Sequence, residues 1–251
     1  MPPASRTGST DLAAVADLLW RASDEREDDG RPRLSAWLIV DAAVAIADAE
    51  GLDALSMQRV ASELGYTSMA LYRHIPGKDR LVAAMIDVAT GRPPAPPSSP
   101  VAWRAEIESW VDALWELYLR HPWLARAPTL SAPVGPNELA WFEALLSPLS
   151  RAGLDRAELI PTATFISSAV RDLARVATEL DPAAAAAYGQ VLERHLDPGR
   201  FPVLSSLMAE EGLVEDDGDH LAPSVHHGLS RLLDGIEVLR DRHRSTEEKG
   251  T

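Results

Sequence analysis

The chain has 251 residues, of which 46% are hydrophobic, and a formal net charge of −14. This length allows one or two domains with a sizeable core. The lack of cysteine excludes disulfides and thiolate metal sites, and no apolar run reaches the roughly 18 residues of a membrane span. Because the N-terminus has no basic start followed by an apolar core, we expect no signal peptide and a cytoplasmic protein without a membrane partner.

Residues 1–32 are a predicted N-terminal extension. The segment Asp11–Arg21 has the spacing of a short amphipathic helix, and the acidic stretch Asp24–Arg33 follows as a solvated linker. Two interpretations stay open: a flexible arm that contacts DNA through Arg31 and Arg33, or a disordered or loosely docked segment. We favour the second for the acidic part, because like charges repel phosphate.

Residues 33–90 contain the cap and turn residues of a compact helical domain, which we call the head. A helix with an apolar stripe begins near Ile39, and Gly51 marks its end. A second helix follows Ser56, which is suited to cap it, and its Val60, Ala61 and Leu64 share one face. Gly65 then favours the left-handed conformation at which a helix ends and the chain turns.

The turn leads to a further predicted helix, Ser68–Ile75, with Thr67 as its N-cap. Leu71 and Ile75 are four residues apart, so both can pack on the preceding helix. The pair of helices therefore predicts a helix-turn-helix. In such a motif the N-terminal residues of the second helix meet base edges in the major groove, which makes the candidates for base reading Ser68, Met69 and Ala70.

A second group of side chains, beside these readers, is suited to phosphate. Tyr72, Arg73, His74 and Lys78 supply hydroxyl, guanidinium, imidazole and ammonium groups. Short helix pairs with a glycine turn are also common in proteins that bind no DNA, so the pattern alone leaves the function open.

The negative charge of the chain argues against nucleic-acid binding, but it is unevenly distributed. Residues 33–90 carry 5 basic and 7 acidic residues, whereas residues 91–251 carry 15 basic and 24 acidic ones. The head is thus close to neutral. Few phosphate contacts predict moderate affinity for each head, so a dimer is expected.

The remaining chain predicts an all-α architecture. Proline excludes helix from residues 91–100, which we interpret as a Pro-rich linker. Residues 101–244 follow as a helical domain, and residues 245–251 as a polar tail. Helical spacing is found at about residues 101–120, 136–151, 157–180, 182–196 and 224–242, and no run of alternating residues predicts a hairpin.

The segment from Ile39 to Leu81 resembles the N-terminal domain of the TetR (tetracycline-repressor) family. This resemblance covers about a fifth of the chain. The residues that carry it are Ala61, Leu64, Gly65, Leu71, Tyr72, His74 and Lys78. Looser similarity to a tetracycline-repressor-like C-terminal domain extends over Leu18–Ala22, His121–Leu154 and His227–Leu239.

The resemblance implies a homodimeric regulator, mostly a repressor, that binds a palindromic operator in double-stranded DNA and is released by a small-molecule effector. It implies base reading by Gln58, Ser68, Met69 and Ala70, and backbone contacts by Thr67, Tyr72, Arg73 and Lys78. Met69 and Ala70 are unusual at base-reading positions, since their side chains can contact a thymine methyl but cannot form bidentate hydrogen bonds with a base.

The resemblance also implies that two long helices meet their symmetry mates in a four-helix bundle. The expected helices are Ala157–Leu180, with Ile160, Thr164 and Leu173 among small residues, and Ser224–Arg242, with a leucine-rich stripe. The alternative is that both stripes face the core of their own chain. The helix Lys78–Thr90 joins head and core, so we expect it to be the lever by which a bound ligand moves the heads out of register with DNA.

An effector pocket inside the C-terminal domain is a further implication of the resemblance. Its candidate lining residues are Trp110, Trp115, Trp141, Phe142, Phe165 and Arg171. Each aromatic ring is more commonly a core residue, and we interpret Arg171, Asp172 and Arg175 as a local ion-pair cluster. The histidines lack diagnostic spacing, so we expect no metal and no cofactor.

Two other classes of function remain as alternatives. Neither a nucleophile elbow, a phosphate-binding loop, a dinucleotide fingerprint nor a zinc-protease motif is present in the sequence, so we expect no enzyme. A helical adaptor that binds other proteins and no DNA is the remaining alternative.

Overall fold

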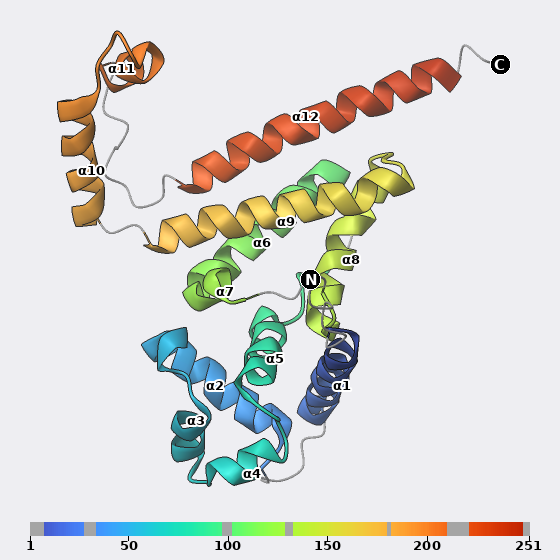
Figure 1. The fold of residues 1–251 in the computed structure, drawn as a ribbon. Helices are drawn as coiled ribbons and strands as arrows, with labels where there is room; N and C mark the ends of the chain where they lie inside the picture. The colour runs from blue at the N-terminus through green and yellow to red at the C-terminus, as the bar shows by residue number, and fades with distance from the viewer. Residues whose placement is uncertain are drawn as a thin grey trace, which may run out of the picture.

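A computed structural model describes residues 8–27, 34–96, 102–128, 133–179, 182–209 and 221–247. Across these ranges the regular structure is helical and contains no strand. The expected all-α fold is confirmed. Figure 1 shows a small helical head at one end and a larger group of long helices at the other.

The head contains α1 (Gly8–Glu27), α2 (Ala36–Glu50), the short 3-10 helix η1 (Leu52–Ala54), α3 (Met57–Leu64), α4 (Ser68–Tyr72) and α5 (Lys78–Thr90). The helix expected at Asp11–Arg21 is longer than predicted. It packs against α2 and α5 and buries Val15, Leu18, Leu19 and Ala22. The extension therefore contributes a packed helix, while Arg31 and Arg33, proposed as a DNA-contacting arm, lie outside the described residues.

The larger domain contains α6 (Trp103–Arg120), α7 (Pro122–Arg126), α8 (Pro136–Arg151), α9 (Arg156–Glu179), α10 (Pro182–His195), α11 (Pro202–Ala209) and α12 (Leu221–Glu247). Helices α6, α8, α9 and α12 pack together around fully buried Ile107, Leu145, Leu149 and Leu233. Figure 1 shows α9 and α12 side by side at the end farthest from α4, with α10 and α11 standing off to one side.

Two boundaries and two short helices differ from the prediction. The helix expected to reach Ile75 ends at Tyr72, because a residue that precedes proline, as Ile75 precedes Pro76, avoids the helical region. Helix α12 extends beyond the predicted Ser224–Arg242 at both ends. The helices α7 and α11 were not predicted, since runs of five and eight residues carry too little periodicity to be recognised.

Head and core share one apolar interior, in which α5 packs against α8 as well as against α1 and α2. The position of the head relative to the core is thus set by packed helices. Among the described residues, no helix combines the length and the hydropathy that a membrane crossing requires.

Candidate nucleic-acid interface

Local capping fixes the first helix of the helix-turn-helix. The Ser56 hydroxyl accepts a hydrogen bond from the Arg59 amide at 3.0 Å, as an N-cap residue should. At the other end Gly65 has φ 71° and ψ 28°, and its amide bonds back into the last turn of α3. Both features agree with the prediction from sequence. Together they give α3 a fixed start and a fixed exit.

The second helix, α4, is held against the first by two apolar side chains. Leu71 and Ile75 are fully buried, and α3 and α4 pack together. The Thr67 hydroxyl accepts from the Ala70 amide at 3.3 Å, which confirms Thr67 as the N-cap of α4. This packing turns the remaining surface of α4 outward.

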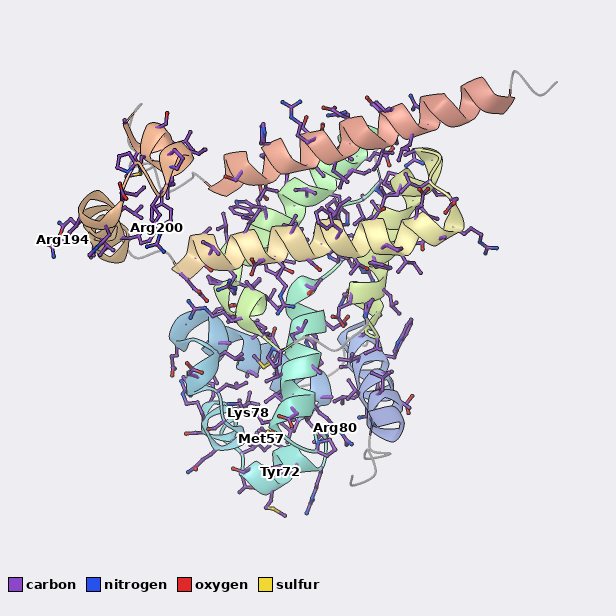
Figure 2. All side chains as sticks on the ribbon, turned by 45° about the horizontal axis from the view of Figure 1, so that its top comes forward. Met57, Tyr72, Lys78, Arg80, Arg194 and Arg200 are labelled. Atoms are coloured by element: carbon purple, nitrogen blue, oxygen red, sulfur yellow. The ribbon has the colours of Figure 1, made fainter. Side chains whose placement is uncertain are left out.

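The candidate base-reading residues lie on that outward surface. Met69 is 71% exposed, and Gln58 on α3 is also exposed, while Ser68 and Ala70 are half-buried. Figure 2 shows Tyr72 at the tip of the head, at the end of the molecule opposite α12. Three of the four candidates, Ser68, Met69 and Ala70, thus share the short helix α4 with Tyr72.

The candidate phosphate contacts surround these readers. Tyr72 is 45% exposed, and Arg73 and Lys78 are exposed without an intramolecular partner among the described residues. Arg59 is not free in this way, because its guanidinium binds Glu50 at 2.7 Å and Glu63 at 2.6 Å, which raises the pKa of Arg59. The exposed cations Arg73 and Lys78 are therefore available to phosphate.

Three of the candidate effector residues are tryptophans that are buried in this structure. The Trp110 indole donates to the carbonyl of Trp141 at 2.9 Å, and the two rings stack edge to face with centroids 5.6 Å apart. The Trp141 indole donates in turn to the carbonyls of Thr90 and Gly91 at the end of α5. Trp115 is buried with them. Their observed contacts are those of core packing and helix capping.

Arg171 also has a different role from the one expected. Its guanidinium donates to the carbonyls of Ala125 and Ala127, which lie two residues apart at the end of α7. The expected ion-pair cluster forms instead around Arg175, which binds Asp172 at 3.0 Å and Glu179 at 2.9 Å. Arg171 thus ties α9 to α7.

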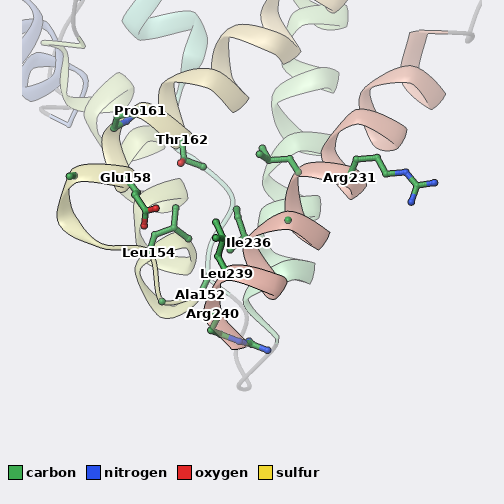
Figure 3. A pocket seen from close by; sticks show the side chains of 13 residues that line it. Ala152, Leu154, Glu158, Pro161, Thr162, Arg231, Ile236, Leu239 and Arg240 are labelled. Carbon is green, nitrogen blue, oxygen red and sulfur yellow. The ribbon is translucent and has the colours of Figure 1, made fainter. Parts of the chain in front are cut away.

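Two hollows lie beside the long helices. A groove of about 470 Å³ is lined by the α8–α9 corner and α12, including Leu154, Pro161 and Ile236, with Glu158 and Arg240 also on its wall (Figure 3). A smaller apolar hollow of about 120 Å³ lies between α6, α9 and α12. Of the six candidate effector residues, Phe165 lines the smaller hollow and is 62% exposed, whereas Phe142 is half-buried against the core.

No group of three metal-ligating side chains occurs among the described residues. His226 instead lies 3.2 Å from Asp112, as a single pair between α12 and α6. The described side chains thus provide no assembled site for a metal ion.

A capped helix-turn-helix with exposed readers, carried by a larger helical domain, defines a DNA-binding transcriptional regulator. Residues 39–85 match the family model of the bacterial regulatory proteins of the tetR family, and residues 95–240 match the tetracyclin repressor-like C-terminal domain. The chain belongs to the TetR family. The expected ligand-responsive, DNA-binding repressor is confirmed at that level.

Similar proteins agree with this assignment. The chain is 36% identical over 248 residues to the transcriptional repressor DrrR1 of Streptomyces coeruleorubidus, covering 93% of this chain and 88% of the repressor. ActR of Streptomyces coelicolor, solved in complex with actinorhodin, matches with a TM-score of 0.71 at 27% identity, over 82% of this chain and 96% of ActR. Apo ActR matches with a TM-score of 0.72 at 27% identity, over 83% and 99% of the two chains.

Proposed function

We propose that this chain binds a palindromic operator as a homodimer and is released from it by a small-molecule effector. The main observation that supports this function is the exposed surface of α4, which faces outward because Leu71 and Ile75 are buried. In a helix-turn-helix this is the surface that enters the major groove. The family assignment supports the same function.

The proposed contacts fall into two groups with different consequences. Base edges face Gln58, Ser68, Met69 and Ala70, while phosphates face Thr67, Tyr72, Arg73 and Lys78. The Gln58 amide and the Ser68 hydroxyl are the polar readers of the first group, and the Met69 side chain suits a thymine methyl. Loss of a phosphate contact should therefore weaken binding to every sequence, whereas loss of Gln58 should relax the choice of sequence.

Two observations support the homodimer. Apolar side chains are exposed along the two long helices, with Ile160 59% and Phe165 62% exposed on α9, and Val238 50% and Leu239 46% exposed on α12. An apolar surface of this kind is typical of a site that binds another protein. A two-fold partner would place two identical heads on successive major grooves, which accounts for a palindromic operator.

The effector proposal rests on the smaller apolar hollow beside Phe165. Its volume of about 120 Å³ is below the roughly 300 Å³ or more that ligand sites usually have. An effector would therefore have to widen it, and widening separates α6, α9 and α12. A ligand that favours such a widened state shifts the population away from the DNA-binding arrangement. The apolar lining suits an apolar or aromatic effector, and ActR with actinorhodin offers a precedent for a ligand in a related protein.

We infer two further properties from the function. A regulator that acts on chromosomal DNA works in the cytoplasm of a bacterium. We also infer that the chain is not an enzyme, because its family consists of regulators and its sequence contains no assembled catalytic motif.

The double substitution Tyr72→Ala and Lys78→Ala tests the proposed interface. Both side chains are exposed and neither belongs to the buried core, so the variant should keep its fold and its oligomeric state but lose operator binding. Gel-shift titration measures the binding, and circular dichroism with light scattering verifies the fold and the mass. Exposed Arg120→Ala, on α6 in the larger domain, is the matched control. Retained operator affinity in the double variant would contradict the assignment.

A further inference from the structure

The helix that leaves the head, α5, meets α8 of the larger domain in a joint where each helix caps the other. Figure 1 shows α5 running from the head toward the core and ending beside α8. Asp87 lies in the last turn of α5 and is 1% exposed, which makes it the one buried charged side chain in the described part of the chain. A buried carboxylate requires partners, and it finds them on α8.

The Asp87 carboxylate caps the N-terminus of α8 from outside that helix. One carboxylate oxygen accepts from the backbone amides of Asn137 and Glu138, at 2.9 and 3.0 Å. The other accepts from the Asn137 side-chain amide at 3.0 Å, which also donates to the Asp87 carbonyl at 3.0 Å. A negative charge at this end of a helix is favourable, because the free amides there carry partial positive charge.

Gly135 leaves the room that this cap needs. It is the N-cap residue of α8 and provides no side-chain cap of its own. A Cβ atom at Gly135 would overlap the Asp87 carboxylate. The N-cap position of α8 is therefore shaped to accept a side chain from α5 in place of its own.

The second half of the joint runs in the opposite direction. The Trp141 indole, one turn into α8, donates to the carbonyls of Thr90 and Gly91 at 3.2 and 3.0 Å. These carbonyls belong to the free C-terminus of α5. Trp141 is itself held by α6, since its own carbonyl accepts from the Trp110 indole. The end of α5 is thus tied to α8, and through it to α6.

We propose that Asp87 is a positioning residue that fixes the head in its DNA-binding orientation by tying α5 to the N-terminus of α8. The side chain touches no DNA and lies at the other end of α5 from Lys78. Its effect on operator binding would act through orientation, because α5 follows α4 in the chain and packs against α2, which in turn packs against α3 of the helix-turn-helix. The effect on DNA rests on the proposed operator function, whereas the effect on orientation does not.

The expected loss of operator affinity follows from the fraction of molecules whose head is in the DNA-binding orientation. If the untied head occupies the competent orientation one time in ten, apparent affinity falls about tenfold, since affinity scales with the competent fraction. A role limited to stability would lower the melting temperature and leave the orientation of the folded protein unchanged.

The orientation can be measured directly, because the chain has no cysteine. Spin labels at Ser62→Cys on α3 and Glu143→Cys on α8, both exposed, report the distance from head to core by pulsed electron resonance. Labelled chain is diluted into excess unlabelled chain, so that only distances within one chain are seen. The wild type should give one narrow distribution.

Three substitutions in the joint should act in a graded way. Asp87→Ala removes the cap, and Gly135→Ala displaces it while keeping the carboxylate, so each should broaden or shift the distribution. Each should also weaken binding, by about tenfold, to a DNA fragment selected with the wild type. Asp87→Asn keeps an acceptor for the two backbone amides and should stay close to the wild type.

The matched control is Asp155→Ala. Asp155 also caps a helix by accepting from two backbone amides, those of Ala157 and Glu158 at 2.8 and 3.0 Å, but it does so locally at the start of α9 and away from the joint. This variant should lose stability and keep the narrow distribution. Narrow distributions in folded Asp87→Ala and Gly135→Ala, or equal broadening in Asp155→Ala, would overturn the proposal. If the wild type bound no DNA, the proposed function would fail, while the distances would still decide the role of Asp87.

Discussion

The half-buried Glu138 side chain of α8 is a second carboxyl group that interacts with Asp87 at the joint. Burial, with the charge of Asp87 as a smaller cause, raises the pKa of Glu138 to about 7. The backbone amides of Gly135 and Val134 act in the opposite direction and lower the pKa of Glu138. Burial raises the pKa of Asp87 as well, against the bonds from α8.

These shifts predict that stability falls as pH rises from about 4.5 to about 7. In that window the native protein binds more protons than the unfolded chain, because the pKa of Glu138 is higher in the folded state. Glu138→Gln should flatten this part of the profile, by at most roughly 3.5 kcal/mol at about 1.4 kcal/mol per pKa unit. Chemical denaturation between pH 4.5 and 8 measures it, with exposed Glu143→Gln as the control. Parallel profiles for Glu138→Gln and the wild type would refute the effect.

At the residue scale, the exposure of the candidate base-reading residues was predictable and the caps across the joint were not. Exposed Met69 and buried Leu71 follow from helical spacing alone, since residues two positions apart on a helix lie on roughly opposite sides. The contacts of Asp87 with Asn137 and of Trp141 with Gly91 join positions about fifty residues apart. No local pattern marks such pairs, so sequence analysis assigned Trp141 to an effector site.

At the scale of elements, the helix-turn-helix depends on its caps. Helix α3 has 8 residues and α4 has 5, and isolated helices so short are unstable in water. Their packing and caps supply the missing stability. Because caps are local, Ser56, Gly65 and Thr67 were all predictable from sequence, and the structure confirms each. Helical spacing predicts that α4 extends to Ile75, whereas the helix ends at Tyr72, because Pro76 disfavours the helical conformation at Ile75.

The turn itself gives a sharp prediction. Gly65→Ala should destabilise the protein by about 1 kcal/mol, because a side chain at φ 71° is strained although the site has open space around it. Gly189→Ala, in the interior of α10 and also without neighbours within 4 Å, should instead be neutral or slightly stabilising. Urea denaturation compares the two. Equal stability of the Gly65→Ala variant and the wild type would show that the turn does not need glycine.

At the scale of the whole molecule, the long helices divide their apolar residues between two surfaces. Leu229, Leu233 and Ile236 of α12 are buried in the core of their own chain, whereas Ile160 of α9 and Leu239 of α12 are exposed. The family resemblance implied that both stripes meet a partner, whereas the alternative placed them on the core of their own chain, and the three buried residues of α12 follow the alternative. Helical spacing identifies an apolar stripe but not the neighbour that covers it.

The exposed apolar residues of α9 and α12 predict a dimer interface that one substitution can disrupt. Ile160→Asp places a charge on the proposed interface, so we expect a monomer by light scattering and operator affinity reduced to that of a single head. Leu119→Asp alters a side chain that is 47% exposed on α6, outside the proposed interface, and should remain dimeric. A dimeric Ile160→Asp variant that still binds operator would place the interface elsewhere.

The most direct test of the account is selection of bound sequences from a random DNA pool, with the purified protein at fixed moderate salt. We predict enrichment of a palindrome whose half-sites are about one helical turn apart or slightly more. The variant Tyr72→Ala with Lys78→Ala should enrich nothing. A folded dimer that enriches no sequence, or a motif without two-fold symmetry, would contradict the claim that paired helix-turn-helix heads read an operator.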